Sequence, residues 1–119
     1  MDNPLVLLVS ANRGELETLS SELGEEGYAT VAAASLEELD GAIKKQEDIQ
    51  LALLDIAGFD KGIWERCGRL HGAKIPFIVI APQRSPAVQR ESLKHGASGL
   101  LVKPLGIKEL LEHIYTLTW

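Results

Sequence analysis

The sequence predicts an α/β domain in which helices cover both faces of a five-stranded parallel sheet. Apolar runs of strand length alternate five times with stretches of helical periodicity. The apolar runs are continuous and do not alternate with polar residues, which is typical of strands buried on both faces. The chain has 119 residues, of which 45% are hydrophobic, and this size supports one hydrophobic core. We therefore expect a single doubly wound domain over residues 1–119.

The first two strand and helix pairs occupy the N-terminal part of the chain. Leu5 to Val9 is a continuous apolar run, and leucines at helical spacing follow it. Asn12 is the expected N-cap of this first helix, because Glu15 stands three residues later, as in a capping box. A second strand is expected at Thr30 to Ala33, and Ser35 then opens a second capping box at the start of the next helix.

The same alternation continues to the end of the chain. Three further apolar runs have strand length: Leu51 to Leu54, Phe77 to Ile80 and Leu100 to Val102. The helix after the first of these runs carries Cys67 on its apolar face. Ser85 and Pro86 have the residue types of an N-cap and a first helical position. An amphipathic helix that begins near Ile107 completes the pattern.

Ionisable residues stand at the ends of two of the predicted strands. In doubly wound sheets, ligands bind beyond the C-terminal ends of the strands, so function is expected at the segments found there. Those segments are Ser10-Ala11-Asn12, Asp55-Ile56-Ala57, Ala81-Pro82 and Lys103-Pro104. Asp55 and Lys103 each follow an apolar run directly. We expect them to form an ion pair at this edge of the sheet.

Three segments carry a resemblance to a known family. They are Leu53-Leu54-Asp55, Ile75 to Pro82, and His95 to Pro104. In the last segment, Gly96-Ala97, the strand after it and Lys103-Pro104 follow one another in an order and spacing that resemble the receiver domain of two-component response regulators. The likeness extends over essentially the whole chain.

The resemblance implies both a fold and a chemistry. The implied fold is a flavodoxin-like three-layer α/β/α sandwich with strand order 2-1-3-4-5 and a cis peptide bond between Lys103 and Pro104. The implied chemistry is phosphoryl transfer from a histidine kinase to an aspartate, and Asp55 matches the acceptor position. No enzymatic activity of the chain itself is expected.

Several positions of the family's phosphoryl site hold different residues in this chain. Four lack the side chains that the family uses: Ser10 and Ala11 replace the acidic pair that holds Mg²⁺, Ala81 replaces a hydroxyl residue, and Leu100 replaces the switch aromatic. One carboxylate, Asp55, then faces one ammonium, Lys103, so we expect a local charge near zero and weak Mg²⁺ binding. This pattern indicates a degenerate pseudo-receiver.

Three functions can be compared from the residues. The first is a signalling module that acts through protein contacts, independently of phosphorylation and without a cofactor. The second is an active phosphoacceptor, in which a histidine kinase phosphorylates Asp55 with Mg²⁺ held by Ser10, Asn12 and backbone oxygens. The third, a small-molecule site in the same crevice, is disfavoured because the loop after the first strand contains only one glycine, Gly14.

The charge is distributed unevenly along the chain. The net charge is −5, but residues 1–60 carry 13 acids and 3 bases, whereas residues 61–119 carry 4 acids and 9 bases. The bases are spaced singly, without interleaved aromatic residues, which disfavours nucleic-acid binding and favours an acidic protein partner. The resemblance places the partner face on the fourth helix, fifth strand and fifth helix, with Arg90, Lys94 and Lys108. The candidate partners are a histidine kinase, a fused output domain, or a second copy in a homodimer.

The remaining functional residue types have simpler interpretations. Cys67 is the only cysteine, so there is no disulfide framework, and we expect it to be a core residue instead of a nucleophile. Three histidines lack metal-ligand spacing and are expected at surfaces or helix ends: His71, His95 and His113. Trp64 has two interpretations that stay open, as a cover for the core or as an anchor for a partner.

The ends of the chain and its apolar runs bear on its location. No apolar run is long enough to cross a bilayer, and the N-terminus lacks the features of a signal peptide, so we expect a cytoplasmic protein without membrane contact. The last residues are apolar. This ending predicts either that the domain was cut from a longer protein or that Trp119 folds back onto the domain.

Overall fold

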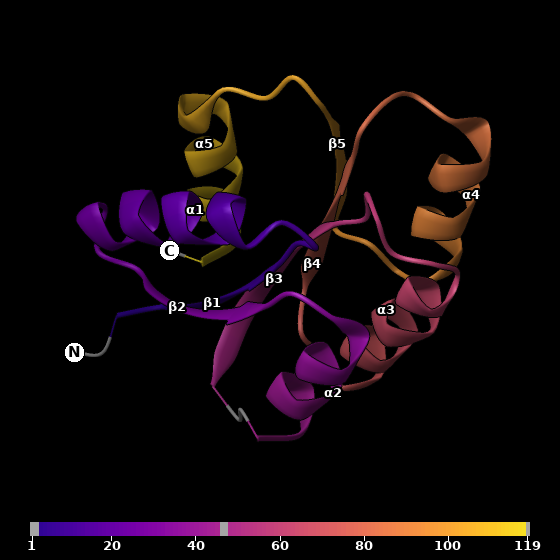
Figure 1. Ribbon diagram of the computed structural model, residues 1–119, viewed down its shortest axis with the longest axis horizontal. Coiled ribbons are helices and arrows are strands. Elements are labelled where there is room, and N and C mark those ends of the chain that lie inside the picture. The colour runs from indigo at the N-terminus through magenta and orange to yellow at the C-terminus, as the bar shows by residue number, and fades with distance from the viewer. Residues whose placement is uncertain (1–2, 46–47, 119) are drawn as a thin grey trace.

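Five parallel strands form one sheet, and a helix follows each strand (Figure 1). The computed structural model describes residues 3–45 and 48–118. In this part of the chain the elements are β1 (Leu5–Val9), α1 (Arg13–Glu25), β2 (Ala29–Ala33), α2 (Leu36–Lys45), β3 (Ile49–Asp55), α3 (Gly62–Gly72), β4 (Phe77–Ala81), α4 (Pro86–Lys94), β5 (Gly99–Val102) and α5 (Ile107–Thr118). The sheet order is β2-β1-β3-β4-β5, and all neighbouring strands are parallel. The doubly wound fold and the strand order are therefore confirmed.

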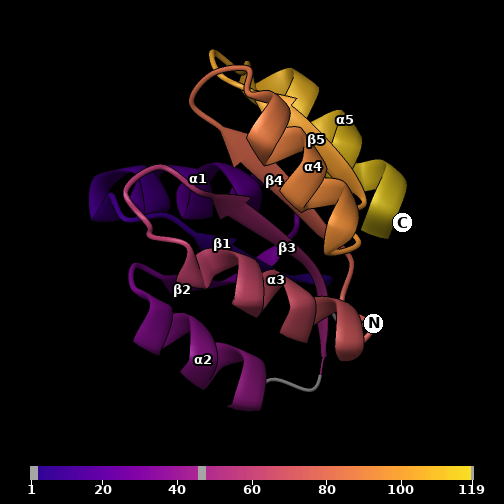
Figure 2. The ribbon, with the colours of Figure 1, turned by 90° about the vertical axis from the view of Figure 1, so that its right-hand side faces the viewer.

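The helices form two layers, one on each face of the sheet. α1 and α5 lie on one face, and α2, α3 and α4 lie on the other (Figures 1 and 2). Successive side chains of a strand point to opposite faces, so Val6 and Leu8 of β1 pack in the core under α1 and α5, whereas Leu7 and Val9 pack in the core under α2 and α3. The apolar runs are continuous because both faces of the central strands are buried.

The first strand, β1, has its predicted bounds, and the other four extend by one or two residues beyond their predicted ranges at one end or both. Hydrogen bonding to a neighbouring strand sets the ends of a strand, and it can include polar residues that an apolar pattern omits. Asp55 is the last residue of β3 and pairs with Ile80 of β4. The bond that Ile56 N donates to the carbonyl of Ile80 continues the ladder by one residue. This pairing fixes the backbone that carries the Asp55 carboxylate.

Three predicted helix starts are confirmed, and neither predicted capping box closes on the N–H of its N-cap residue. Ser35 accepts a hydrogen bond from Glu38 N at 3.1 Å at the start of α2, but the Glu38 side chain accepts from Ala34 N at 2.8 Å and not from Ser35 N. Asn12 accepts a hydrogen bond from Glu15 N at 3.1 Å, and Ser85 caps α4 by accepting one from Val88 N at 3.3 Å. The Glu15 side chain does not return to the N–H of Asn12, as a capping box requires. That N–H donates to Ser10 Oγ at 3.1 Å, and Glu15 turns to another partner.

Three smaller predictions concern the backbone, Cys67 and the end of the chain. The peptide bond between Lys103 and Pro104 is cis, as expected. Cys67 is fully buried, and burial raises the pKa of its thiol to about 12, so it is a core residue. No helix within residues 3–45 and 48–118 is long and apolar enough to span a membrane. Trp119 lies outside the described residues.

Candidate functional site

The C-terminal ends of β1, β3 and β5 bring together Ser10, Asp55 and Lys103. Parallel strands all end at the same edge of the sheet, so residues distant in sequence meet there. Ser10 follows β1, Asp55 ends β3 and Lys103 follows β5. Ser10 and Asp55 are buried, whereas the Lys103 side chain is 35% exposed. The site is thus a buried carboxylate with an ammonium group that reaches it from the surface.

The expected ion pair between Asp55 and Lys103 is present. Lys103 Nζ lies 2.5 Å from Asp55 Oδ2, and the Asp55 side chain is only 6% exposed. The other carboxylate oxygen, Oδ1, accepts a hydrogen bond from Ala57 N at 3.2 Å. Both oxygens of Asp55 are therefore engaged within the protein, which is the requirement for a buried charge to be tolerated.

Glu15 is a third member of this site that the sequence analysis assigned only to helix capping. Lys103 Nζ donates to Glu15 Oε1 at 3.1 Å and lies 3.5 Å from Oε2. Two carboxylates thus share one ammonium, and the expectation of a local charge near zero is wrong. The sequence position of Glu15 could have indicated this, because Glu15 lies in the first turn of α1, directly after the C-terminal end of β1. We call Glu15, Asp55 and Lys103 the charge cluster.

The cluster perturbs the protonation of two of its members. Burial, reinforced by the neighbouring Asp55 carboxylate, raises the pKa of Glu15 above its ordinary value of 4.5. The hydrogen bond to Asp55 is the largest cause that raises the pKa of Lys103 above 10.5. Lys103 is therefore held in its charged form, while Glu15 accepts a proton more readily than an exposed glutamate does.

The residues present do not fit the Mg²⁺ that the family resemblance implies. Mg²⁺ needs several oxygen ligands in octahedral geometry. The carboxylates of the site surround an ammonium group, which takes the central position that a cation needs. The hydroxyl of Ser10 is already bonded to the N–H of Asn12, and the side chain of Ala11 has no donor atom. No group of three or more metal-ligating side chains occurs within the described residues.

The other two positions named from the resemblance hold only apolar side chains. Ala81 ends β4, is buried and offers a methyl group where a hydroxyl is expected in the family. Leu100 is half-buried in β5 and packs against the core cluster under α2 and α3. Neither side chain can donate a hydrogen bond to a phosphoryl group on Asp55.

The predicted partner residues lie on helices that flank the edge strand β5. Arg90 and Lys94 are on α4, Lys108 is on α5, and all three are exposed. None of them has an ion-pair partner within residues 3–45 and 48–118. On α3, by contrast, Arg66 and Arg69 are paired to Asp40 of α2 at 2.9 and 3.1 Å.

The ring of Trp64 in α3 stacks on the ring of His95, which follows the last residue of α4. The ring centroids of Trp64 and His95 are 6.1 Å apart with an interplanar angle of 22°. Trp64 also packs against the core, which favours its interpretation as a cover, while a role as a partner anchor stays a prediction. The His95 Nδ1 atom lies 2.8 Å from the carbonyl of Glu91, at the C-terminal end of α4.

Comparisons with known proteins give a consistent result at the level of structure. No protein-family model and no curated protein sequence matches the chain. A CheY-like response regulator receiver domain protein from Methanospirillum hungatei superposes with a TM-score of 0.89 and 26% identity, over 97% of this chain and 93% of that one. A response regulator receiver protein from Pseudomonas putida gives 0.87 and 24%, over 98% of both chains.

A third similar structure contains a modified aspartate. It is a response regulator from Burkholderia pseudomallei with a phosphorylated aspartic acid, a calcium ion and citrate. It superposes with a TM-score of 0.79 and 24% identity, over 92% of this chain and 65% of that one.

Proposed function

From the premise that this chain has the receiver-domain fold of two-component response regulators, we propose that it is a signalling module that acts through protein contacts without phosphorylation of Asp55. The observation that supports this proposal is the charge cluster. Asp55 already has the cation and the backbone donor that a receiver would offer to a phosphoryl group. In the unphosphorylated protein, the Asp55 carboxylate accepts hydrogen bonds from Lys103 and from Ala57 N, and Lys103 also donates to Glu15.

Phosphorylation of Asp55 is unfavourable in this setting. A phosphoryl group adds about −1.5 to −2 charges, whereas the cluster, with all its members ionised, already holds one more negative than positive charge. Lys103 is the cation in contact with Asp55, and it is shared with Glu15. Phosphoryl transfer depends almost entirely on charge compensation and positioning, usually with a metal ion between the oxygens. The site lacks carboxylates at Ser10 and Ala11 for that ion.

The surface of α4 and α5 supports a role in protein binding. The large hydrophobic residues that are exposed in the described part of the chain all lie on these two helices: Leu93, Ile107, Tyr115 and Leu117. The bases Arg90, Lys94 and Lys108, which have no ion-pair partner among the residues that the structure describes, lie on the same helices. The same two helices also carry three acids, Glu91, Glu109 and Glu112, so the apolar residues are bordered by both charges. The excess of bases is on α4, where apolar Leu93 beside Arg90 and Lys94 suits an acidic patch on a protein partner. We propose that this surface binds a kinase, an output domain or a second copy of the chain.

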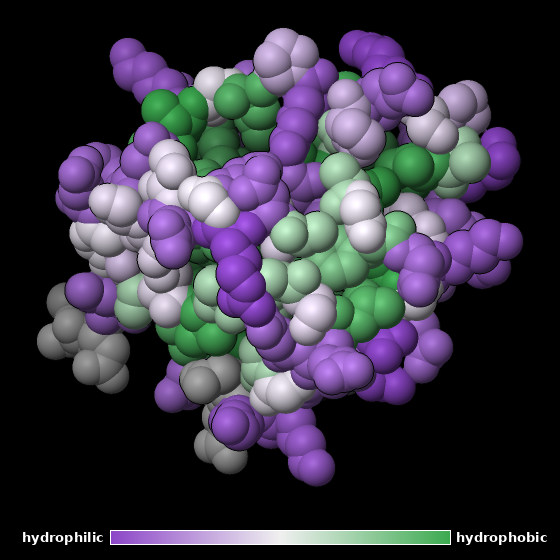
Figure 3. All heavy atoms as spheres, in the orientation of Figure 1, coloured by the Kyte–Doolittle hydropathy of each residue, from purple (hydrophilic) through white to green (hydrophobic). Residues whose placement is uncertain are grey.

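The rest of the surface is more evenly mixed. On the face shown in Figure 3, hydrophilic side chains dominate the rim and separate smaller apolar areas from one another. Such interrupted apolar areas are ordinary for a folded domain and do not by themselves mark an interface.

A second candidate function is phosphoacceptance at Asp55. It is favoured by the position of Asp55, which is buried at the end of β3 and in contact with Lys103. The similar structure from Burkholderia pseudomallei contains a phosphorylated aspartic acid, which also favours this candidate. The two candidates differ in what acetyl phosphate should do to the native protein.

The experiment that separates the candidates is labelling with acetyl phosphate in the presence of Mg²⁺. We expect no acid-labile phosphate on the native protein. The triple variant S10D/A11D/A81T restores two carboxylates and a hydroxyl, so it should gain both Mg²⁺ affinity and labelling of Asp55. Adding Asp55→Asn to the triple variant is the matched control and should abolish the label. Stoichiometric, Mg²⁺-dependent labelling of native Asp55 would overturn the first proposal.

A cellular test addresses the partner surface. In a strain whose signalling output depends on this protein, Asp55→Asn should keep the output, because an amide still fills the cluster. The double variant R90E/K94E should lose it, because the reversed charges repel an acidic partner. K44E/K45E reverses two bases at the end of α2 and is the matched control. An output that is lost in D55N and kept in R90E/K94E would contradict the proposal.

A further inference from the structure

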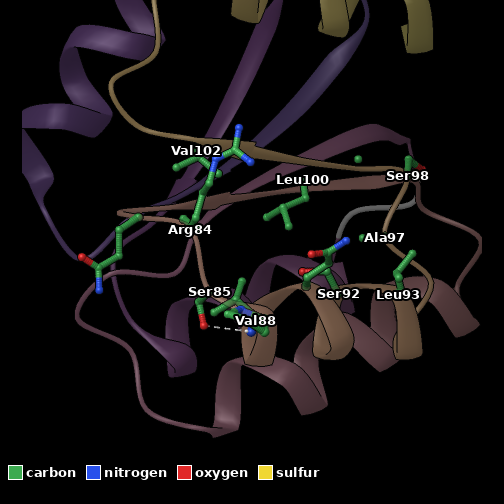
Figure 4. A pocket seen from close by; sticks show the side chains of 14 residues that line it. Arg84, Ser85, Val88, Ser92, Leu93, Ala97, Ser98, Leu100 and Val102 are labelled. Carbon is green, nitrogen blue, oxygen red and sulfur yellow. Dashed lines mark hydrogen bonds between the residues drawn. The ribbon is translucent and has the colours of Figure 1, made fainter.

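A cavity of about 590 Å³ lies between α4 and the edge of the sheet formed by β4 and β5 (Figure 4). Apolar side chains form much of its wall: Ala81, Val88, Leu93, Ala97, Leu100 and Val102. Neither Asp55 nor Lys103 lines it. Its volume lies in the range of cavities that hold small organic molecules, about 300–1,000 Å³.

Small side chains on the sheet leave this space open. Ala81 of β4 contributes one methyl group, and Gly99 of β5 contributes no side chain. Leu100 lies over the cavity and is shorter than an aromatic residue would be (Figure 4). Ala81 and Leu100 thus border the cavity at two positions where the resemblance leads us to expect a hydroxyl residue and an aromatic residue.

Ser92 is a buried polar group in the cavity wall that has no partner. Its residue is only 2% exposed, and its hydroxyl has no hydrogen-bond partner within the described residues. A serine or threonine in a helix usually bonds to the carbonyl four residues earlier, as Thr116 and Thr118 do on α5. A buried hydroxyl without a partner is costly. The oxygen itself is shielded from solvent, so a ligand that presents a polar group at this wall would remove the cost once the hydroxyl rotates towards the cavity.

Arg84 supplies a cation at the other end of the cavity. It is exposed, lines the rim, and has no ion-pair partner in residues 3–45 and 48–118. Figure 4 shows its guanidinium beside Val102, at the end opposite Leu93 and Ala97. The N-terminus of α4, at Ser85, lies at this same end and favours negative charge. Among the described residues, no acidic side chain lines the cavity.

We propose that this cavity binds a small aliphatic carboxylate that carries a second polar group, a hydroxyl or a ketone, near its far end. The carboxylate pairs with Arg84, because a guanidinium binds carboxylates through two parallel hydrogen bonds. The chain lies along Leu100 and Val102, and the second polar group bonds to Ser92. Ser92 stands seven positions after Ser85, the neighbour of Arg84, and α4 rises about 10 Å over that interval. An extended eight-carbon chain has this length.

This proposal does not depend on whether Asp55 is phosphorylated. The cavity lies against β5 and beneath α4, and α4 also carries part of the proposed partner surface. A ligand there would therefore contact the underside of that surface. Binding of the ligand and labelling of Asp55 are measured separately, so either proposal can fail while the other stands.

The experiment is a titration of ¹⁵N-labelled protein, followed by amide chemical shifts, with three probes. The probes are 8-hydroxyoctanoate, octanoate and 1-octanol. We expect saturable shifts at Val88, Leu100 and Val102, with 8-hydroxyoctanoate about fivefold tighter than octanoate because of its bond to Ser92. Arg84→Gln should weaken both carboxylates about tenfold and leave 1-octanol unchanged. Lys45→Gln, at the exposed C-terminal end of α2 and outside the cavity lining, is the matched control and should leave the binding of all three probes unchanged.

Two further variants make the test decisive. Ser92→Ala should erase the difference between 8-hydroxyoctanoate and octanoate. Leu100→Trp should fill the cavity and abolish binding of all three probes, and Ala97→Phe fills it from the opposite side if the first variant does not fold. No saturable shift with any probe, binding that persists in a folded filled variant, or equal affinities for octanoate and 1-octanol would overturn the proposal.

Discussion

Removing Lys103 should destabilise the protein more than removing the charge of Asp55. In Lys103→Met, two carboxylates remain side by side without their cation, and the Asp55 side chain is only 6% exposed. In Asp55→Asn, Lys103 keeps Glu15 at 3.1 Å as its counter-charge. The amide oxygen of the substituted side chain can still accept hydrogen bonds. The asymmetry arises because only one of the two variants leaves an uncompensated buried charge.

The magnitudes follow from burial and from the remaining partners. An unpaired buried charge costs about 3–5 kcal/mol. Glu15 can relieve part of this by taking up a proton, because burial already raises its pKa, so we expect a loss near the lower end, about 3 kcal/mol. Asp55→Asn loses one charge-assisted hydrogen bond to a lysine that is 35% exposed. Water screens that interaction, so we expect a loss of about 1 kcal/mol.

The assay is urea unfolding at several pH values. At pH 7 the free energy of unfolding should fall further in Lys103→Met than in Asp55→Asn by about 2 kcal/mol. The penalty in Lys103→Met should shrink as pH falls towards 5, because Glu15, whose pKa burial already raises, takes up a proton and no longer repels Asp55. The double variant Asp55→Asn/Lys103→Met should recover part of the free energy of unfolding that Lys103→Met loses. An Asp55→Asn variant that is as unstable as Lys103→Met, or a Lys103→Met penalty that is independent of pH, would refute this reasoning.

Three other predictions can be checked by the same unfolding measurements. Because the pKa of Glu15 is raised in the folded state, the folded protein binds more protons than the unfolded chain. The free energy of unfolding of the native protein should therefore decline, relative to that of Glu15→Gln, as pH rises from about 4.5. A difference between the two proteins that stays constant with pH would argue against this. Asp40→Ala should cost about 1 kcal/mol and less at about 1 M salt, because Asp40 pairs with two arginines of α3; a loss unaffected by salt would contradict it. Gly96→Ala should cost about 1–2 kcal/mol, because φ is +85° and the added Cβ would collide with the exposed His71 ring, which must move away. Gly41→Ala, which meets nothing within 4 Å, is its control and should be neutral or stabilising.

The elements of the fold could be predicted because their signals are local. A continuous apolar run such as Leu5–Val9 identifies a buried strand, and Ser85 followed by Pro86 identifies a helix start. The strand order and the cis bond at Lys103 were predicted by resemblance, since periodicity alone does not say which strands are neighbours. The pairing of Asp55 with Lys103 followed from both residues standing at strand ends.

The parts of the site that could not be predicted depend on which of several possible partners a side chain contacts in the folded protein. Glu15 fits a capping box, and a sequence pattern cannot show that an ammonium 88 positions away attracts its carboxylate instead. Ser92 is an ordinary helical serine in the sequence, and only packing shows that its hydroxyl is buried without a partner among the described residues. The cavity depends on the combined sizes of side chains from β4, α4 and β5, a quantity that no single segment contains.

The uneven charge of the two halves of the chain has a consequence for self-assembly. In the sheet, β2, β1 and β3 belong to the acidic half of the sequence, and β4 and β5 to the basic half. A two-fold symmetric dimer through α4 and α5 would join two copies of a surface that carries three bases and three acids, so salt should change its stability little. A head-to-tail contact joins the acidic half of one copy to the basic half of the next and can extend beyond two copies. It should dissociate as the salt concentration increases. Ionic strength therefore distinguishes a closed pair from an open chain of molecules.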